Sequence, residues 1–158
     1  MIKAKKVADK STDLKRGVDY IGVTVNFLVH DGNGKILLHK RSQNCRDEQG
    51  RWDIGGGAVE FGETLDDAVR RELKEELCVE PTELSAVQHY DAHRINNGVP
   101  THWVAITYIA RVNPENVKIG EPHKIDDIGW FTKDALPTPR HSMFDKAYEI
   151  AVAHNILR

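Results

Sequence analysis

Apolar and polar residues alternate near the beginning of the chain. The odd positions of residues 21–29 are apolar, which is typical of a strand with one buried face: Ile21, Val23, Val25, Phe27 and Val29. The segment DGNGK, residues 31–35, is rich in residues that tolerate positive φ and predicts a hairpin turn. We therefore expect ILLHKR, residues 36–41, to form the returning strand and residues 42–50 to form a polar loop.

The spacing of apolar residues changes after the segment RWDIGGG, residues 51–57. From Thr64 onward the period is near 3.6, which indicates a helix with one apolar stripe. Thr64 is suited to cap the start of this helix, and Asp66 and Asp67 are favourable in its first turn. The stripe consists of Leu65, Ala68, Val69, Leu73 and Leu77.

The remaining chain predicts further strands and a second helix. Strand-like segments occupy about residues 83–92 and 102–112, and a short strand covers 128–131. A final amphipathic helix is expected at 142–156, with Met143, Ala147, Ile150 and Ala151 facing inward. Because strands and helices interleave, the fold class is α/β with a mixed sheet. We expect residues 1–17 to form an N-terminal arm and residues 18–158 to form a single domain.

Composition restricts the class of protein. The chain has 158 residues and a formal net charge of -2, which disfavours a protein that coats nucleic acid. Its two cysteines, Cys45 and Cys78, fit a reducing compartment. The start of the chain lacks the apolar region of a secretory signal, and no apolar run is long enough to cross a bilayer. The expectation is a soluble cytoplasmic protein without a membrane partner.

Three glutamates lie at the margin of the predicted apolar stripe. With Leu65 set at zero, Glu76 falls at about 20°, Glu72 at about −20° and Glu75 at about −80° around the helix axis. A glutamate four residues before a lysine or arginine would be compensated, but Glu72 has Glu76 at that position. Half-buried carboxylates need a partner, and Mg²⁺ or Mn²⁺ is a suitable one. The alternative is an ordinary solvated acidic face.

The glycine triplet before the helix adds to this hypothesis. Gly55, Gly56 and Gly57 remove side chains where the backbone turns sharply or approaches a ligand. Glycine-rich turns that lead into a helix are also common anion sites. Alone the triplet indicates only a turn, but together with the glutamates it suggests a combined phosphate and metal site.

The segment GAVEFGETLDDAVRRELKEELCV, residues 57–79, resembles the signature of the Nudix (MutT-like) hydrolases. The match is carried by Gly57, Glu63, Arg71, Glu72, Leu73, Glu75, Glu76 and Val79. Two positions depart from the pattern. The final glycine of the signature is Cys78, which follows the helix where positive φ is often needed. In family members that act on nucleoside triphosphates, a proline often precedes the glycine pair, and here Gly55 occupies that position.

The resemblance implies a Nudix-type α/β/α sandwich that hydrolyses a nucleoside diphosphate linked to another group, using Mg²⁺ or Mn²⁺. By motif position Glu72, Glu75 and Glu76 are the catalytic metal ligands, and either Glu72 or Glu76 lies nearest the attacking water. The carbonyl of Gly56 joins the metal shell. A further ligand is expected downstream, with Glu121 and Asp126 preferred over Glu115 and Asp127.

The same resemblance assigns the remaining positions of the motif. Glu63 and Arg71 are expected to form a salt bridge that holds the loop with Gly57 on the helix. Gly56 and Gly57 approach the substrate, and Arg41 either reaches a substrate phosphate or is a surface arginine. Trp52 and Trp103 either stack on a base or pack in the core.

The histidines do not predict a metal site. His89, His93 and His102 lie on or near strands, but their spacing is not that of a zinc site. Core or surface histidines are therefore the better interpretation.

Two other classes of protein share such a fold. A diphosphate isomerase needs a reactive cysteine in a characteristic context, which Cys45 does not provide. A non-catalytic nucleotide-binding module usually lacks one of the helix carboxylates, and here all three are present. The substrate stays open among nucleoside triphosphates, including oxidised ones, ADP-ribose, nucleotide sugars and dinucleoside polyphosphates. A homodimer also stays open.

Overall fold

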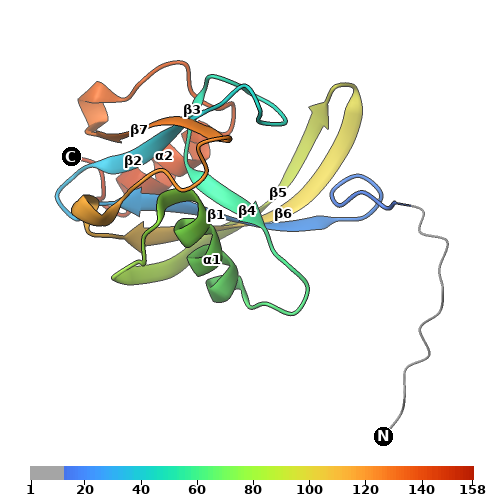
Figure 1. The fold of residues 1–158 in the computed structure, drawn as a ribbon, viewed down its shortest axis with the longest axis horizontal. Coiled ribbons are helices and arrows are strands. Elements are labelled where there is room, and N and C mark those ends of the chain that lie inside the picture. Colours follow the sequence, from blue (N-terminus) through green and yellow to red (C-terminus); the bar gives the residue numbers. More distant parts are fainter. Residues whose placement is uncertain (1–12) are drawn as a thin grey trace, which may run out of the picture.

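The computed structural model describes residues 13–158 and consists of a mixed β-sheet with one α-helix on each face (Figure 1). This arrangement confirms the predicted α/β/α sandwich. The strands are β1 (Gly22–His30), β2 (Ile36–Arg41), β3 (Trp52–Asp53), β4 (Gly55–Ala58), β5 (Glu83–Asn96), β6 (Val99–Arg111) and β7 (Ile125–Phe131). The helices are α1 (Leu65–Leu77) and α2 (Phe144–Ala153), with short 3₁₀ helices at Pro114–Asn116 and Lys133–Ala135.

Strand β1 is the centre of the sheet. It runs parallel to β6 along its whole length and antiparallel to β4 from Thr24 to Phe27. The predicted hairpin of β1 and β2 is present, but the two strands pair only at Val29 and His30. Beyond that point β2 pairs instead with β7 and β3. Because β2 leaves β1, the glycine-rich strand β4 takes its place beside the middle of β1.

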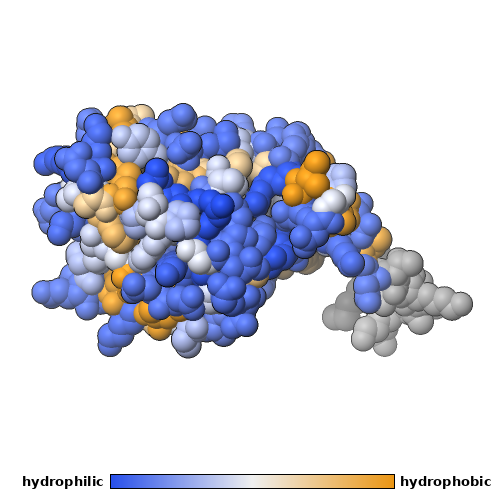
Figure 2. Space-filling model, turned by 90° about the horizontal axis from the view of Figure 1, so that it is seen from above, coloured by the Kyte–Doolittle hydropathy of each residue, from blue (hydrophilic) through white to orange (hydrophobic). Residues whose placement is uncertain are grey.

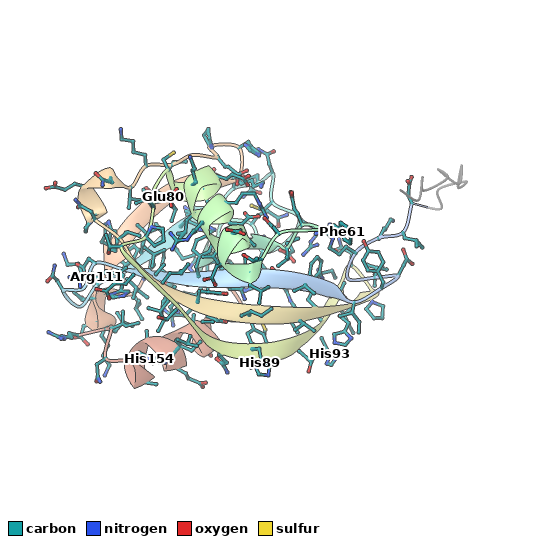
Figure 3. All side chains as sticks on the ribbon, turned by 90° about the horizontal axis from the view of Figure 1, so that it is seen from below. Phe61, Glu80, His89, His93, Arg111 and His154 are labelled. Carbon is teal, nitrogen blue, oxygen red and sulfur yellow. The ribbon has the colours of Figure 1, made fainter. Side chains whose placement is uncertain are left out.

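The two faces of β1 are both buried at its C-terminal half, which corrects the prediction of a single buried face. Val25, Phe27 and Val29 pack with α1, whereas Leu28 packs with α2. The N-terminal half of the strand differs, since Val23 is 37% exposed. The two helices cover the C-terminal half of β1 from both sides and leave the other half open (Figure 3).

Helix α1 begins and ends as predicted. The Thr64 hydroxyl accepts a hydrogen bond from the Asp67 backbone at 3.2 Å, which caps the first turn. Cys78 ends the helix with φ of 55°, in the left-handed region that usually favours glycine. The buried stripe differs in one position, because Leu65 is 37% exposed and the stripe begins at Ala68.

Several element bounds differ from the sequence prediction. Strands β5 and β6 are longer than expected because they are joined by a two-residue turn, Asn97 and Gly98, both with positive φ. Such turns match the twist of the strands and let pairing continue to the tip. Strand β7 begins at Ile125, and α2 is shorter than residues 142–156.

The structure describes only the end of the predicted N-terminal arm. Most of the predicted arm, residues 1–12, lies outside the described residues; beyond it, Gly17 donates to the Tyr20 carbonyl in a turn. The face seen in Figure 2 is mainly hydrophilic with separate hydrophobic patches. Between residues 13 and 158 no helix combines the length and the apolar character that crossing a membrane requires.

Candidate active site

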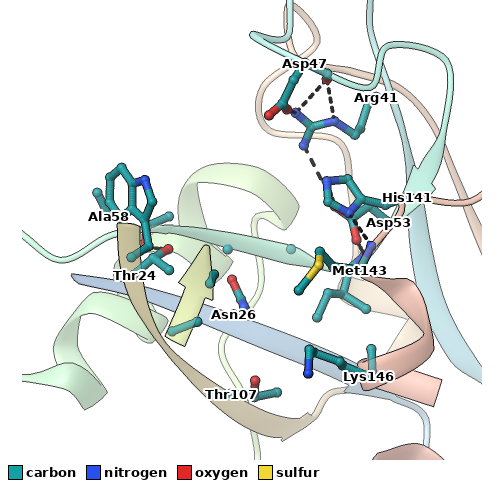
Figure 4. Close-up of a pocket in the computed structure, with 18 of the residues that line it drawn as sticks. Thr24, Asn26, Arg41, Asp47, Asp53, Ala58, Thr107, His141, Met143 and Lys146 are labelled. Carbon is teal, nitrogen blue, oxygen red and sulfur yellow. Dashed lines mark hydrogen bonds and ion pairs between the residues drawn. The ribbon is translucent and has the colours of Figure 1, made fainter. Parts of the chain in front are cut away.

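A cavity of about 500 Å³ lies on the face of the sheet that α2 partly covers (Figure 4). Its walls come from distant parts of the chain: the loop after β2, the strand β4, the start of α2 and the loop before β7. Its floor is formed by the half of the sheet that the helix leaves open. The splayed strands β1 and β2 therefore create the space, and the short helix α2 does not fill it.

The floor of the cavity is built mainly from small side chains in register across four strands. Ala58, Thr24, Ala105 and Tyr90 form one row from β4 through β1 and β6 to β5. In the next row Gly56 pairs with Asn26, and Asn26 with Thr107. Further along the same face the row containing Leu28 is covered by α2. Small residues thus keep the open half of the sheet accessible.

The glycine triplet forms strand β4, not the predicted turn. None of its three residues has a positive φ, so backbone freedom is not the reason for glycine here. A Cβ atom at Gly57 would lie 2.0 Å from Glu72 Oε1, and one at Gly55 would lie 2.6 Å from Glu76 Oε2. The strand has no room for side chains, because the Glu72 carboxylate lies against Gly57, and the Phe27 ring and Glu76 lie against Gly55.

Glu76 is the residue of α1 that reaches the cavity. Its side chain is buried, and Oε2 has no hydrogen-bond partner among the described residues. Burial raises the pKa of the Glu76 carboxyl well above its ordinary value, and the carboxylates of Glu72 and Glu121 raise it further. An unpaired buried carboxylate is costly, so this atom is suited to an external cation.

Glu121 lies beside this group, on the loop before β7. Its carboxylate accepts two hydrogen bonds from Lys124 Nζ, at 2.9 and 3.0 Å, and it is close enough to raise the pKa of Glu76. Lys124, which the sequence did not single out, lines the cavity. Burial lowers the pKa of its ammonium group, but the Glu121 carboxylate outweighs this effect and the net pKa is raised.

Arg71 organises the other glutamates of the motif. It binds Glu63 through two hydrogen bonds, Nη2 to Oε1 at 2.7 Å and Nε to Oε2 at 3.1 Å, so the predicted salt bridge is present. The same guanidinium donates to the Ala58 carbonyl, which fastens the end of β4 to α1. It also pairs with Glu72 at 2.6 Å and with the more exposed Glu75 at 3.4 Å.

The three helix glutamates therefore have different surroundings. Glu72 is buried and paired with Arg71, Glu75 is about half exposed, and Glu76 is buried without a partner for Oε2. Burial raises the pKa of Glu72, while Arg71 lowers it. Within residues 13–158, no three His, Cys, Asp or Glu side chains converge closely enough to form a metal site in their present rotamers.

Arg41 lines the cavity, but its side chain is hydrogen-bonded to the loop that follows β2. Its Nη2 donates to Asp47 Oδ1 at 2.8 Å, and its Nε donates to the Asp47 carbonyl at 3.1 Å (Figure 4). Asp53 lies 3.9 Å from Arg41 Nη1, and its side chain is 14% exposed. Burial raises its pKa to about 7, although Arg41 and the Ile54 backbone N–H lower it. Arg41 is thus a cavity residue whose charge is already partly compensated.

The loop with Asp47 is tied to β5 and α2 by more ion pairs. Arg94 donates to Asp47 at 3.3 Å and to Glu48 at 3.0 Å, and His141 Nε2 contacts Glu48. Burial lowers the pKa of His141 to about 4, and its Nδ1 accepts a hydrogen bond from the Met143 backbone. We call Arg41, Asp47, Glu48, Arg94 and His141 the loop network.

The histidines and tryptophans occupy distinct environments. His89 and His93 are exposed on β5, and the His93 ring packs against that of His102 (Figure 3). Trp52 packs edge-on against Phe131, with ring centroids 5.2 Å apart, next to the α2 core. Trp103 instead lines the cavity. Of the two tryptophans considered from sequence, only Trp103 is positioned to contact a bound molecule.

Several cavity residues escaped sequence reasoning. Asn26 carried no signal, because a polar residue is expected at the even positions of the alternating strand. Arg94 and His141 carried no signal, since they lie far apart in the sequence and meet only through the loop network. Lys124 carried no signal either, because a lysine in a polar loop is usually a solvated surface residue. Among the predicted alternatives to Glu121, Asp126 and Asp127 lie at the exposed start of β7 and Glu115 lies in the 3₁₀ helix.

Comparisons with known proteins agree with this architecture. The family model of the NUDIX domain matches residues 21–150. The chain is 36% identical to an ADP-ribose pyrophosphatase of Methanocaldococcus jannaschii over 85% of its own length and 76% of that protein. It is 27% identical to the 8-oxo-dGDP phosphatase NUDT18 of Mus musculus over 80% of its own length, a match that spans 36% of the mouse protein.

A solved structure also has a similar fold. The crystal structure of a MutT NUDIX hydrolase from Burkholderia pseudomallei superposes with a TM-score of 0.72 at 32% identity, covering 82% of this chain and 97% of that one. Because the NUDIX model covers most of the chain and the fold agrees, this protein belongs to the Nudix hydrolase family.

Proposed function

We propose that this protein hydrolyses the diphosphate linkage of a nucleoside diphosphate joined to a second group, by attack of water on phosphorus, with Mg²⁺ or Mn²⁺ as cofactor. The observation that carries the proposal is the buried Glu76 Oε2 atom, which has no partner among the described residues and belongs to a side chain lining the cavity. The names of the relatives support a nucleotide substrate, since one is an ADP-ribose pyrophosphatase and another an 8-oxo-dGDP phosphatase.

The residues present fit a divalent cation. Hard oxygen ligands suit Mg²⁺ and Mn²⁺, and Glu72, Glu76 and Glu121 bring three carboxylates to one region. Glu76 has an oxygen free to bind, whereas Glu72 and Glu121 would exchange part of their pairing with Arg71 and Lys124. Glu75 and the Gly56 carbonyl complete the proposed ligand set. When bound, the cation would neutralise phosphate charge and acidify a bound water.

The chain's own groups would hold and orient the diphosphate. Lys124 places an ammonium group in the cavity wall, and Arg41 places a guanidinium group there as well. Gly56 and Gly57 present backbone without side chains, so a phosphate can approach closely. Either Glu72 or Glu76 would accept the proton of the attacking water, because both lie against this strand.

The two alternative functions are less well supported. A diphosphate isomerase would need a reactive cysteine in the cavity, but the Cys45 thiol donates to the Lys124 carbonyl at 3.2 Å and is not a lining residue. A non-catalytic binding module would not require the unpaired Glu76 carboxylate. Hydrolysis is therefore the function that the geometry supports best.

A substrate panel tests the proposal. Nucleoside triphosphates, 8-oxo-dGDP, ADP-ribose, nucleotide sugars and dinucleoside polyphosphates would be incubated with Mg²⁺ or Mn²⁺, and released phosphate, pyrophosphate and nucleotide measured. We expect one class to be cleaved, and we expect EDTA to abolish cleavage. Reaction in ¹⁸O-labelled water would identify the attacked phosphorus. Nucleotide binding without turnover on any compound would favour the binding module, and cleavage unaffected by EDTA would overturn the metal assignment.

A further inference from the structure

Tyr90 and Trp103 both line the cavity, and their surroundings differ. The Tyr90 ring is covered by the Lys146 ammonium group at 4.8 Å from its centroid, and its hydroxyl accepts a hydrogen bond from Asn26 at 3.3 Å. Trp103 belongs to neither hydrophobic core, although it lies on a central strand. An indole at this position is available to a ligand in a way that the Tyr90 ring is not.

Two glycine residues pack closely against the indole ring of Trp103. Gly22 is its partner on β1, where an added Cβ would lie 2.4 Å from the indole Cε3 atom. An added Cβ at Gly17, which has a φ of 78°, would lie 2.1 Å from Nε1. Gly17 is itself fixed, because its carbonyl accepts from the His102 backbone at 2.8 Å. The indole therefore rests directly against two backbone segments, which limits its motion.

The other neighbours of Trp103 leave space beside the ring. Ala92 is its partner on β5, and Ala105 is the next residue of β6 on the same face. Thr24 and Ala58 continue the floor away from the tryptophan. Side chains larger than alanine or threonine at these positions would fill the volume that now forms this end of the cavity.

We infer that Trp103 is the platform on which the nucleobase of the substrate stacks, with the diphosphate bound at the Glu76 end of the same cavity. The inference rests on the proposed function and adds a subsite to it. Gly22, beside Trp103, and Asn26, beside Gly56, are four residues apart on β1, or roughly 13 Å. This separation leaves room for a ribose between the base and the diphosphate.

Stacking on an indole selects a class of ligand. Every nucleobase has a flat π-face, so a tryptophan platform distinguishes nucleotides from base-free diphosphates and does not itself choose one base. The platform also explains the small floor residues, since a stacked base needs a flat space next to the ring. Trp103 thus contributes to substrate binding and takes no part in the proton transfers.

Paired probes with and without a nucleoside test this subsite. Binding of α,β-methylene ADP, its GDP counterpart and base-free methylenediphosphonate would be measured by calorimetry in Mg²⁺ for the parent, Trp103→Ala and Trp103→Phe. We expect Trp103→Ala to weaken the affinity for the two nucleotide analogues about fivefold to 100-fold, as loss of a base–aromatic stack predicts. The affinity for methylenediphosphonate should not change. Trp103→Phe should restore most of the affinity, because a phenyl ring also stacks.

Tryptophan fluorescence provides an independent measurement with a matched control. The nucleotide analogues should quench the parent and Trp52→Phe, which alters a tryptophan packed on Phe131, but should not quench Trp103→Phe. Equal weakening of all three probes by Trp103→Ala, or unchanged binding of all three, would overturn the inference. If the parent binds none of the probes, the proposed function itself fails and the platform fails with it. Thermal midpoints of the variants would show whether each is folded.

Discussion

Two groups of charged side chains each contribute residues to the wall of the cavity, and their charges are compensated to different extents. In the loop network, Asp47 receives hydrogen bonds from Arg41 and Arg94, and Glu48 receives one from Arg94 and contacts His141 Nε2. At the α1 side, the glutamates outnumber the cations that reach them. Arg71 pairs with Glu63 and Glu72, and Lys124 pairs with Glu121, but Oε2 of Glu76 has no hydrogen-bond partner between residues 13 and 158.

The difference separates structure from binding. A buried carboxylate that is fully hydrogen-bonded stabilises the loop it belongs to and has nothing left for a ligand. A buried carboxylate without a partner lowers stability and persists where function requires it. The loop network therefore shapes the cavity, while the α1 glutamates are the candidates for the chemistry.

Glu76→Gln should have the largest effect on function. We expect the rate of hydrolysis to fall by at least about 100-fold, because a charged ligand at the reaction centre is lost. The thermal midpoint should stay the same or rise, since the neutral amide removes a buried unpaired charge. Glu80→Gln, an exposed glutamate after the same helix, is the matched control and should keep parent activity. Near-parent turnover in Glu76→Gln would contradict the assigned roles.

Glu48→Ala should act mainly on stability. Glu48 accepts hydrogen bonds from the Ser142 backbone at 2.9 Å, the Ser142 hydroxyl and Arg94, so it joins the loop to the start of α2. Its loss should lower the free energy of unfolding by about 1–3 kcal/mol, because partly buried donors lose their acceptor. Urea denaturation would measure the change. An unchanged stability would show that the loop network is not structural.

The Glu63–Arg71 pair should make stability dependent on acid pH. The hydrogen bonds from Arg71 lower the pKa of Glu63 from 4.5 to about 2. A carboxyl whose pKa is lower in the folded state stabilises the fold above its ordinary pKa, and this contribution is lost as pH falls from about 4.5 towards 2. Glu63→Gln should therefore have a lower thermal midpoint than the parent at neutral pH. The difference between the two midpoints should become smaller below pH 4. A constant difference across that range would argue against the pair as the cause.

Cys78→Gly should have the smallest effect and should touch neither group. Cys78 ends α1 with a φ of 55°, a conformation that glycine adopts without a steric penalty. We expect an increase in the free energy of unfolding of at most about 1 kcal/mol and no change in turnover. Cys78→Ala is the control, because it removes the thiol and keeps the strained backbone. A gain from alanine equal to that from glycine would assign the effect to the thiol.

Much of the fold follows from local patterns. The first hairpin, helix α1 with its Thr64 cap and the left-handed Cys78 are local features, since each depends on residues a few positions apart. Strands β5 and β6 are longer than the sequence pattern predicts, because the Asn97–Gly98 turn lets their pairing continue to the tip of the hairpin. The two-sided burial of β1 was missed because alternation reveals one face, whereas Leu28 is buried by α2, which is remote in sequence.

The sequence by itself determined the α/β class, the family motif and the placement of Glu72 and Glu76 at the edge of the apolar stripe, because helical periodicity fixes which side chains share a face. Only the tertiary structure decided which of these carboxylates lacks a partner, why the strand beside them is made of glycine, and which tryptophan borders the cavity. Those properties depend on contacts between segments far apart in the chain, where burial and pairing are set by what packs against a residue and not by its neighbours in sequence.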